Sequence, residues 1–495
     1  MIRIHRLFAY SLAFVLVLSS FSDCSRNPVT GKREFSLISE AQEIQMGQQY
    51  DPAVVAEFGL YDDRDLQQFI ETRGMAMARA SERPSLPWSF KVVDSDVVNA
   101  FAVPGGFIYF TRGIMAHFNN EAEFAGVLGH EIGHVTARHT VQQQSKQTLA
   151  QLGLVGGMIL SPELASQGES LMQGLQLLFL KFSRDAESQS DQLGVRYSTQ
   201  QGYDAREMAG FFETLDRLSG GSENRIPTFL STHPDPGQRE QRVRAMAVEA
   251  QQSATAQGIS RGNFKVNRDE YLRMIDGIIY GKDPRQGYVE NSFFYHPELR
   301  FQYQIPNGWS TINSPQMVQM VSPNQDAIMR LMLGQGNNPE QAAQQFVQQN
   351  NLRVVSGRNL STNGLNSYLL IGEAEQRDQQ TGQVQQVISV QANFIAYNGN
   401  IYMLMGMSLK QDFARYQRTF EQSMSSFRQL TDSRYLNRLP ERLRIATNNN
   451  TRTLSAALSA EGIPRDRLEE FSVLNGMPLN AQLERGMLFK ALQRQ

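Results

Sequence analysis

The chain has 495 residues, which is too long for one hydrophobic core and suggests roughly two to four domains. Hydrophobic residues make up 41% of the chain and charged residues 19%, as is usual for a soluble globular protein. The formal net charge of −2 gives no electrostatic reason to expect an anionic membrane surface or nucleic acid as a partner, and we expect no nucleic-acid partner.

Residues 1–23 are predicted to be a signal peptide. Arg3 and Arg6 precede an apolar run at residues 7–18, which is followed by small polar residues and is short for a bilayer span. We therefore expect the mature protein to be exported to the periplasm. A buried N-terminal helix is the alternative interpretation of the same run.

Cys24 is the only cysteine of the chain, so an intrachain disulfide is excluded. A lone cysteine directly after a signal sequence is typical of the lipid-modified residue of a bacterial lipoprotein, which would anchor the protein in the outer membrane. Asp23 stands where lipoprotein signals normally carry a small residue. The sequence is therefore compatible with a chain that is lipidated at Cys24 and with one that is not.

The next part of the chain is predicted to be mainly helical, with a small set of strands. Two helices are expected within residues 36–79, and strands at 90–93, 97–103 and 107–110. A long helix should begin near Asn120, because Asn120 is a suitable N-cap and Glu123 follows three residues later. The spacing of four between Phe124, Leu128 and Ile132 gives this helix an apolar face.

Two apolar stretches, residues 149–160 and 171–182, are each shorter than the ~20 residues that a membrane span needs. We interpret both as packed helices. A helical region should continue to about residue 248, with a loop at residues 232–237, where two prolines disfavour a helix.

After residue 284 the sequence pattern changes from mainly helical to a mixture of strands and helices. Residues 285–432 are predicted to form an α+β module, which includes two strands within 387–408 joined at Asn398-Gly399, a type I′ hairpin signal. Residues 433–495 should form a small βααβ unit. The expected fold class is α+β: a mainly helical domain with a small edge sheet at residues 24–284, an α+β sandwich module, and the βααβ unit.

His130-Glu131-Ile132-Gly133-His134 is an HExxH motif inside the predicted long helix. Four residues make about one helical turn, so both imidazoles project from one face and can share a cation. Zinc suits imidazole and carboxylate ligands and leaves one position for water. Glu131 is placed to accept a proton from that water, so the motif predicts metal-assisted hydrolysis of a peptide bond.

A surface helix with solvated histidines is the alternative interpretation of the motif. It fits poorly, because Gly129 and Gly133 interrupt the helix, and each glycine costs about 1 kcal/mol relative to alanine. This loss is easier to explain if another backbone approaches the helix closely at these positions.

A third metal ligand is required besides the two histidines. An extended zincin motif would need glycine at position 137 and histidine at position 140, but Ala137 and Thr140 stand there, and His139 is one residue out of register. Glu187 and Asp191 lie four residues apart on a predicted helix. Taken alone, this acidic pair fits a solvated helix face better than a metal site.

Three motifs resemble the zinc metallopeptidase family of CAAX prenyl proteases and HtpX, of the gluzincin type. They are the HExxH motif, the Ser-Arg-x-x-Glu-x-x-x-Asp pattern of residues 183–191, and the stretch at residues 99–106. The likeness covers residues 27–280 and is greatest to the soluble periplasmic branch of the family. It implies a zincin-like fold and one Zn²⁺ per chain.

The resemblance also implies roles for particular residues. The metal ligands would be His130, His134 and Glu187, with Glu131 as the catalytic base. Asp191 would orient a ligand histidine.

His233 matches a family histidine that faces the metal, and Arg239 follows in the expected place. His233 would stabilise the oxyanion during turnover or cap the zinc in a latent state; a solvated loop histidine is the alternative. We interpret His117, His139 and His296 as structural.

The stretch from Asn99 to Thr111 resembles the edge strand beside the active-site helix of that family. A protein or peptide substrate would add to it in an extended conformation, so Asn99, Ala100 and Phe101 are predicted substrate contacts. A plain hairpin under the helix is compatible with this role.

The final unit resembles a degenerate LysM domain, on the evidence of Thr453-Leu454, Leu474-Asn475-Gly476 and residues 486–490. The likeness implies binding to peptidoglycan, and an inert structural cap is the alternative.

The leading hypothesis is a zinc endopeptidase of the bacterial cell envelope that acts on misfolded or stalled envelope proteins. One alternative is a latent or non-proteolytic chaperone or assembly factor with the same fold. Another is a scaffold tethered to peptidoglycan by the C-terminal units. Prenyl-peptide processing inside a membrane is disfavoured, because no segment after the signal is long enough to span a bilayer.

Overall fold

The computed structural model describes residues 26–34, 36–154, 182–220, 229, 232–233, 236–258, 261–377 and 383–493, without the side chains of 147–154 and 236–238. The predicted signal peptide, Cys24 and most of the two apolar stretches lie outside the described residues. Within the described part, no helix combines the length and the apolar character that crossing a membrane requires.

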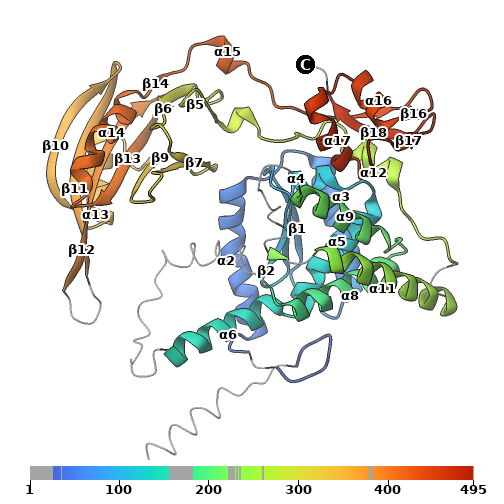
Figure 1. Ribbon diagram of the computed structural model, residues 1–495. Helices are drawn as coiled ribbons and strands as arrows, with labels where there is room; N and C mark the ends of the chain where they lie inside the picture. The colour runs from blue at the N-terminus through green and yellow to red at the C-terminus, as the bar shows by residue number, and fades with distance from the viewer. Residues whose placement is uncertain are drawn as a thin grey trace, which may run out of the picture. The chain divides into compact units, whose positions relative to one another are not determined.

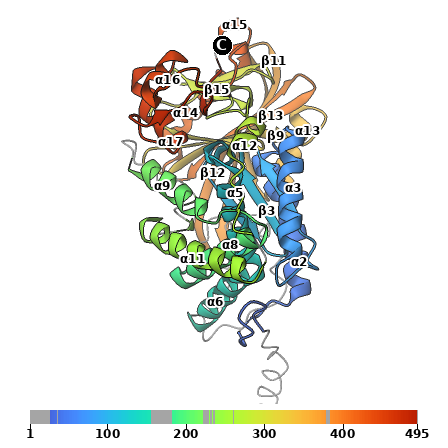
Figure 2. The ribbon, with the colours of Figure 1, turned by 90° about the vertical axis from the view of Figure 1, so that its right-hand side faces the viewer.

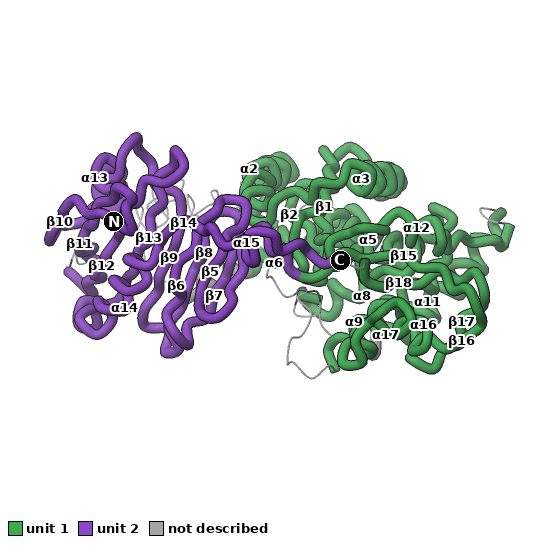
Figure 3. The backbone as a smooth tube through the Cα atoms, turned by 90° about the horizontal axis from the view of Figure 1, so that it is seen from above, with its two compact units in different colours: residues 1–281, 442–495 green, residues 282–441 purple. Residues whose placement is uncertain are grey.

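The chain folds as two compact units (Figure 3). Unit 1 is formed by residues 1–281 and 442–495, and unit 2 by residues 282–441. Each unit contains both helices and sheets, so the predicted mixture of helix and strand is confirmed.

Unit 1 is mainly helical and contains a small sheet in its first segment (Figure 1). The helices of this segment are α2 (Glu40–Phe58), α3 (Arg64–Arg79), α4 (Arg112–His117), α5 (Glu121–Thr136), α6 (His139–Leu154), α8 (Arg184–Gln200), α9 (Glu207–Ser219), α11 (Pro236–Ala256) and α12 (Arg268–Met274). The sheet has the order β1-β3-β2, where β1 (Ser89–Val93) is parallel to β3 (Phe107–Thr111) and β2 (Ala100–Val103) is antiparallel to it.

Helix α5 lies in the middle of unit 1 and packs against β2, α8 and α9 (Figure 2). It begins where expected, because the Asn120 side chain caps it by accepting a 2.8 Å hydrogen bond from the backbone N–H of Glu123. Every residue of the helix is buried. The polar side chains of α5 therefore face the protein interior, where they need partners or ligands.

Residues 442–495 belong to unit 1 rather than standing apart from it. Their elements are β15 (Leu443–Thr447), β16 (Arg452–Thr453), α16 (Leu454–Ala460), η3 (Arg465–Arg467), α17 (Leu468–Leu474), β17 (Gln482–Leu483) and β18 (Leu488–Leu492). Strand β15 pairs with β18, and β16 pairs with β17. Phe471 and Phe489 share one hydrophobic core with Phe118 and Phe124.

A buried lysine joins this C-terminal segment to the helix region ahead of α5. Lys490 of β18 is fully buried, and its Nζ donates hydrogen bonds to the carbonyl oxygens of Phe118, at 2.8 Å, and Leu474, at 2.9 Å. Burial lowers the pKa of Lys490 to about 7. The segment is thus tied to Phe118, which is the C-cap of α4.

The neighbouring His117 gives unit 1 a predicted dependence on pH. It is buried with Nδ1 2.7 Å from the Gly113 carbonyl oxygen, and burial lowers the pKa of His117 to about 4. Between about pH 6.5 and pH 4 the unfolded chain binds a proton here that the folded chain does not. Stability therefore falls as the pH drops through this window, by up to roughly 3 kcal/mol for this one group.

We expect the free energy of unfolding to decrease less steeply with falling pH in His117→Gln than in the wild type. The measurement is urea unfolding between pH 4 and pH 7, followed by the fluorescence of Trp88 in unit 1 after Trp309→Phe has silenced the other tryptophan. Equal slopes with and without His117 would contradict this assignment.

Unit 2 is built on two antiparallel sheets. The first has seven strands in the order β10-β11-β12-β13-β9-β8-β7, and the second has the order β14-β6-β5-β4. The strands are β4 (Tyr288–Glu290), β5 (Phe293–His296), β6 (Phe301–Gln304), β7 (Ser310–Asn313), β8 (Met317–Val321), β9 (Ala327–Gly334), β10 (Arg353–Thr362), β11 (Leu365–Arg377), β12 (Val384–Tyr397), β13 (Asn400–Leu409) and β14 (Arg428–Gln429). The predicted hairpin joins β12 and β13 at Asn398 and Gly399, both of which have positive φ.

Two helices cover opposite faces of the seven-stranded sheet. The helices of unit 2 are η2 (Pro284–Gln286), α13 (Pro339–Gln349), α14 (Phe413–Ser425) and α15 (Ser433–Leu436). Helix α14 packs on the face that carries Ile395 and Leu404, and α13 packs on the face that carries Phe394 and Met403. These residues alternate along β12 and β13, as side chains on the two faces of a sheet must.

Candidate metal centre

Four side chains that can bind a metal meet in the interior of unit 1. His130 and His134 come from α5, Glu187 from the first turn of α8, and His233 from the segment before α11; their ligand atoms all lie within 4.8 Å of one another. The two Nε2 atoms of His130 and His134 are 3.0 Å apart. Glu187 Oε1 lies 3.4 Å from His134 Nε2, and Glu187 Oε2 lies 3.6 Å from His130 Nε2.

Glycines bring the backbones of α5 and α8 into direct contact. A Cβ atom on Gly129 would lie 3.0 Å from the Cα of Gly194, and one on Gly194 would lie 2.9 Å from the carbonyl oxygen of Gly126. A Cβ on Gly133 would lie 3.0 Å from the Cβ of Leu193. The expected close approach of another backbone is confirmed, and it brings α8 near enough for Glu187 to reach the histidines.

Asp191 lies one helical turn after Glu187 and holds the far side of His130. Its Oδ1 is 3.0 Å from His130 Nδ1, which leaves Nε2 of the same ring directed into the cluster. Arg239 is fully buried and donates to both carboxylate oxygens of Asp191, at 2.9 and 2.6 Å. Burial alone would raise the pKa of Asp191, but Arg239 and His130 outweigh it and lower this pKa. The Asp191 carboxylate is therefore ionised and lies in contact with His130 Nδ1.

His233 lies inside the cluster and is 1% exposed, so it is not a solvated loop histidine. Its Nδ1 is 2.9 Å from Glu187 Oε1 and 3.3 Å from His130 Nε2. The ring stacks on Phe229, with the centroids 4.5 Å apart. These contacts place His233 where it can act as a fourth ligand.

A metal ion can bind in this cluster only if a buried carboxylate beside the histidines is ionised. Burial raises the pKa of Glu131, whose Oε1 accepts no hydrogen bond among the described residues. Burial would also raise the pKa of Glu187, but His233, His134 and His130 together hold that pKa well below its usual value.

Glu187 Oε2 is likewise buried without a hydrogen bond, and Arg239 Nη1 lies 3.0 Å from it without hydrogen-bond geometry. Glu187 is thus an ionised carboxylate with one oxygen that no hydrogen bond satisfies, and such an oxygen can coordinate a metal. Imidazole nitrogens with a carboxylate oxygen form a donor set that suits zinc, so the residues fit this metal.

His139 is a further residue of the site that the sequence analysis interpreted as only structural. Its Nδ1 lies 3.1 Å from Nδ1 of His134, and its Nε2 lies 2.9 Å from Gln189 Oε1. The chain turns sharply at Arg138, which has φ 59°, so that α6 starts with His139 beside the ligand. A spacing of five residues from His134 is not a one-face helical spacing, so only this turn reveals the contact.

We expect His139→Phe to weaken metal binding about 10- to 100-fold. The reason is that Nδ1 of His134 then loses its contact with His139, which orients the His134 ring. Phenylalanine keeps a ring in the buried position. The measurement is zinc affinity by competition with a chromogenic chelator, with His296→Phe in unit 2 as the matched control. Unchanged affinity in His139→Phe would show that His139 only fills space.

The predicted substrate strand lies at the edge of its sheet. Among the described residues, β2 pairs with β3 on one side only. Ala100 and Phe101 are buried, and the Phe101 ring stacks on Tyr109 at 5.1 Å, so their side chains face the core. Asn99 is also buried, and its Oδ1 has no hydrogen-bond partner among the described residues.

Comparison with known proteins bears directly on this site. Residues 64–247 match the model of a family described as Peptidase family M48. This match covers the middle of unit 1, so the likeness to peptidase family M48 is shown for these residues. The matched part of the chain runs from the start of α3 into α11 and contains the four clustered residues. The predicted resemblance to a metallopeptidase family is confirmed over these residues.

Several named proteins are similar to this chain. The "Beta-barrel assembly-enhancing protease" of Yersinia pestis is 31% identical over 242 residues, which cover 46% of this chain and 49% of that protein. The protein of the same name from Escherichia coli (strain K12) is 30% identical over 233 residues, covering 45% and 47%. "Mitochondrial metalloendopeptidase OMA1" of Arabidopsis thaliana is 34% identical over 187 residues, covering 38% and 37%. The chain spans about half the length, or less, of these relatives.

Proposed function

We propose that this protein is a zinc-dependent endopeptidase of the bacterial cell envelope that hydrolyses peptide bonds with a metal-activated water. The observation that carries the proposal is the buried cluster of His130, His134 and Glu187 on two helices in backbone contact, with Glu131 beside it. A buried cluster of this composition inside an M48 match supports peptidase chemistry over a scaffold.

Each residue of the site has one role in this proposal. His130, His134 and Glu187 hold one zinc ion per chain, and Asp191, itself held by Arg239, orients His130. When bound, the zinc would lower the pKa of a water molecule and polarise the substrate carbonyl. Glu131 accepts a proton from the attacking water and passes it to the leaving amine nitrogen.

Substrates are proposed to be polypeptides in an extended conformation that add to β2. The support is that β2 has a free edge among the described residues and packs against α5. Asn99 Oδ1, which is buried and accepts no hydrogen bond, would accept one from a substrate backbone N–H. Ala100 and Phe101 would contribute backbone groups, because their side chains face the core.

We further propose a periplasmic location and a role in the quality control of envelope proteins. The predicted signal peptide and the two bacterial relatives named for β-barrel assembly support this placement. The lipid anchor at Cys24 and the peptidoglycan partner of the C-terminal segment stay predictions.

A latent resting state is the second candidate, and His233 favours it. Catalytic zinc sites keep one position open, whereas four protein ligands close a tetrahedral site. His233 lies against Glu187 and His130 with the other donors, so it would occupy the fourth position. A chain held in this state could act as an assembly factor without cleaving its partners.

The mature chain purified without added metal is expected to contain one zinc per molecule and to cleave casein slowly. Metal content is measured by inductively coupled plasma mass spectrometry, and cleavage by gel assay before and after treatment with a chelator. Chelation should abolish cleavage, and added zinc should restore it. A chain that binds no divalent metal would contradict the central proposal.

A further inference from the structure

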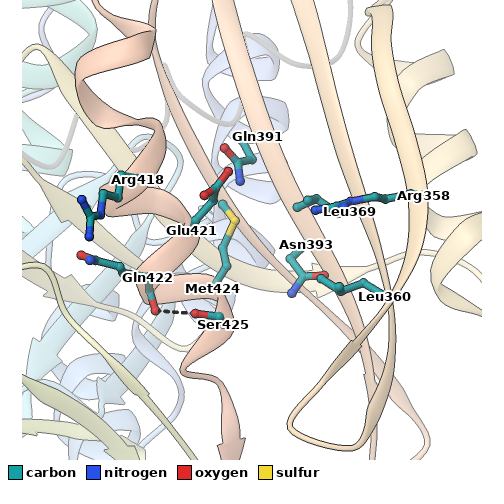
Figure 4. Close-up of a pocket in the computed structure, with 10 residues that line it drawn as sticks. All are labelled: Arg358, Leu360, Leu369, Gln391, Asn393, Arg418, Glu421, Gln422, Met424 and Ser425. Carbon is teal, nitrogen blue, oxygen red and sulfur yellow. Dashed lines mark hydrogen bonds between the residues drawn. The ribbon is translucent and has the colours of Figure 1, made fainter.

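Unit 2 contains a groove of about 390 Å³ that the peptidase function does not use. It lies between α14 and the three outer strands β10, β11 and β12 (Figure 4). Arg358 of β10 is paired with Leu369 of β11, and Leu369 with Asn393 of β12. Neighbours in register share a sheet face, so these side chains lie on the face that α14 partly covers.

Two buried amides at the floor of the groove have polar atoms without hydrogen-bond partners among the described residues. Gln391 is 0% exposed, and neither its Oε1 nor its Nε2 has a partner among the described residues. Asn393 is 1% exposed; its Nδ2 donates to Thr362 Oγ1 at 2.9 Å, but its Oδ1 has no partner. A buried polar atom without a partner destabilises the folded protein, so a ligand that bonds to these atoms would bind favourably.

The spacing of the two amides indicates the shape of that ligand. Gln391 and Asn393 are two residues apart on one face of β12, roughly 7 Å along the strand. An extended peptide beside them repeats its own backbone groups at the same interval. The Gln391 amide offers both a donor and an acceptor, as a peptide unit requires, and Asn393 Oδ1 offers an acceptor for an N–H.

The walls of the groove indicate which side chains the ligand carries. Leu360, which is 37% exposed, and Met424 give it apolar surface. Arg358, Arg418 and Glu421 also line the groove, so its charged side chains carry two positive charges and one negative charge. Figure 4 shows Gln391 and Asn393 between the helix that carries Arg418 and the strand that carries Arg358.

We propose that this groove is a binding site for an extended polypeptide segment with apolar and acidic side chains. Its backbone would bond to Gln391 and Asn393, and its carboxylates would pair with Arg358 and Arg418. Binding here needs neither the metal nor Glu131. That the bound segments belong to substrates of the peptidase rests on the proposed function.

The test replaces each amide by leucine in the full-length chain with Glu131→Gln, so that the probe is not cleaved. The probe is a fluorescein-labelled peptide of alternating threonine and leucine with two glutamates, and binding is followed by fluorescence anisotropy. We expect Gln391→Leu and Asn393→Leu each to weaken binding at least about 10-fold. Gln349→Leu, an exposed amide on α13, is the matched control and should bind as the parent does.

Thermal unfolding of the same variants separates a binding role from a structural one. Because leucine removes buried polar atoms that lack partners, Gln391→Leu is expected to keep or raise the melting temperature of unit 2 while it loses binding. A variant that binds like the parent, or that loses binding only because unit 2 is destabilised, would overturn the proposal. Equal binding of a probe with glutamines in place of the glutamates would overturn the role of the arginines.

Failure of the groove proposal can be distinguished from failure of the proposed peptidase function. A chain that binds the probe through Gln391 but never cleaves casein would contradict the peptidase function and leave this site standing. A chain that cleaves casein, but whose leucine variants bind the probe unchanged, would overturn the groove alone.

Discussion

Glu131→Gln is expected to abolish peptide hydrolysis, by about 10³-fold or more, while zinc content stays at the wild-type level. Glutamine has the shape of glutamate but cannot accept the proton of the attacking water. The three proposed ligands are untouched by this change. The fold should also persist, because burial already raises the pKa of Glu131, and a neutral amide costs less to bury than a carboxylate.

The measurement compares the rate of casein cleavage, metal content and melting temperature of the variant with those of the wild type. Glu213→Gln is the matched control, since it makes the same charge change on an exposed residue of α9 and should leave cleavage unaltered. A Glu131→Gln chain that keeps its zinc and more than a tenth of wild-type cleavage would show that another group accepts the proton.

The part of the site that could be predicted from the sequence is the part that one helix contains. His130 and His134 are four residues apart, and helical geometry alone puts their rings on one face. Gly129 and Gly133 destabilise a helix relative to alanine, and this predicted that another backbone packs closely against α5. Neither inference needed any knowledge of distant residues.

The proposed third ligand could not be derived in that way. Glu187 and Asp191 look like a solvated acidic pair until α8 lies against α5, and that contact depends on Gly194, far along the chain from Gly129. The resemblance supplied Glu187 because it carries information about packing that spacing does not. His139 was missed for the same reason, since its contact with His134 depends on the turn at Arg138.

Elsewhere in the fold too, features that depend on adjacent residues were predicted, and contacts between residues far apart in the sequence were not. The hairpin at Asn398-Gly399 is a local signal, and it is found where expected. The sequence analysis treated residues 433–495 as a unit of their own, because a strand–helix–helix–strand pattern is complete in itself. Its packing is not local, since Lys490 bonds to Phe118 and Phe471 joins the core of unit 1.

His233→Ala is expected to raise casein cleavage at least about 10-fold while the chain keeps its zinc. His130, His134 and Glu187 come from helices that hold each other in backbone contact, so they retain a metal without His233. His233 comes from a separate segment, and removing it frees the fourth position that a catalytic zinc needs for water. Glu187→Ala is the matched comparison in the same cluster, and we expect that variant to lose its zinc.

The direction of the change in His233→Ala separates the two roles that the sequence left open. A cap that closes the metal centre predicts faster cleavage, whereas a donor to the oxyanion predicts cleavage slower by about 10²- to 10³-fold. Zinc content must be measured on the same samples, because loss of metal would also slow cleavage. Slower cleavage at full zinc occupancy would make His233 a catalytic residue and leave the resting site open. Faster cleavage would make it the element whose displacement activates the enzyme.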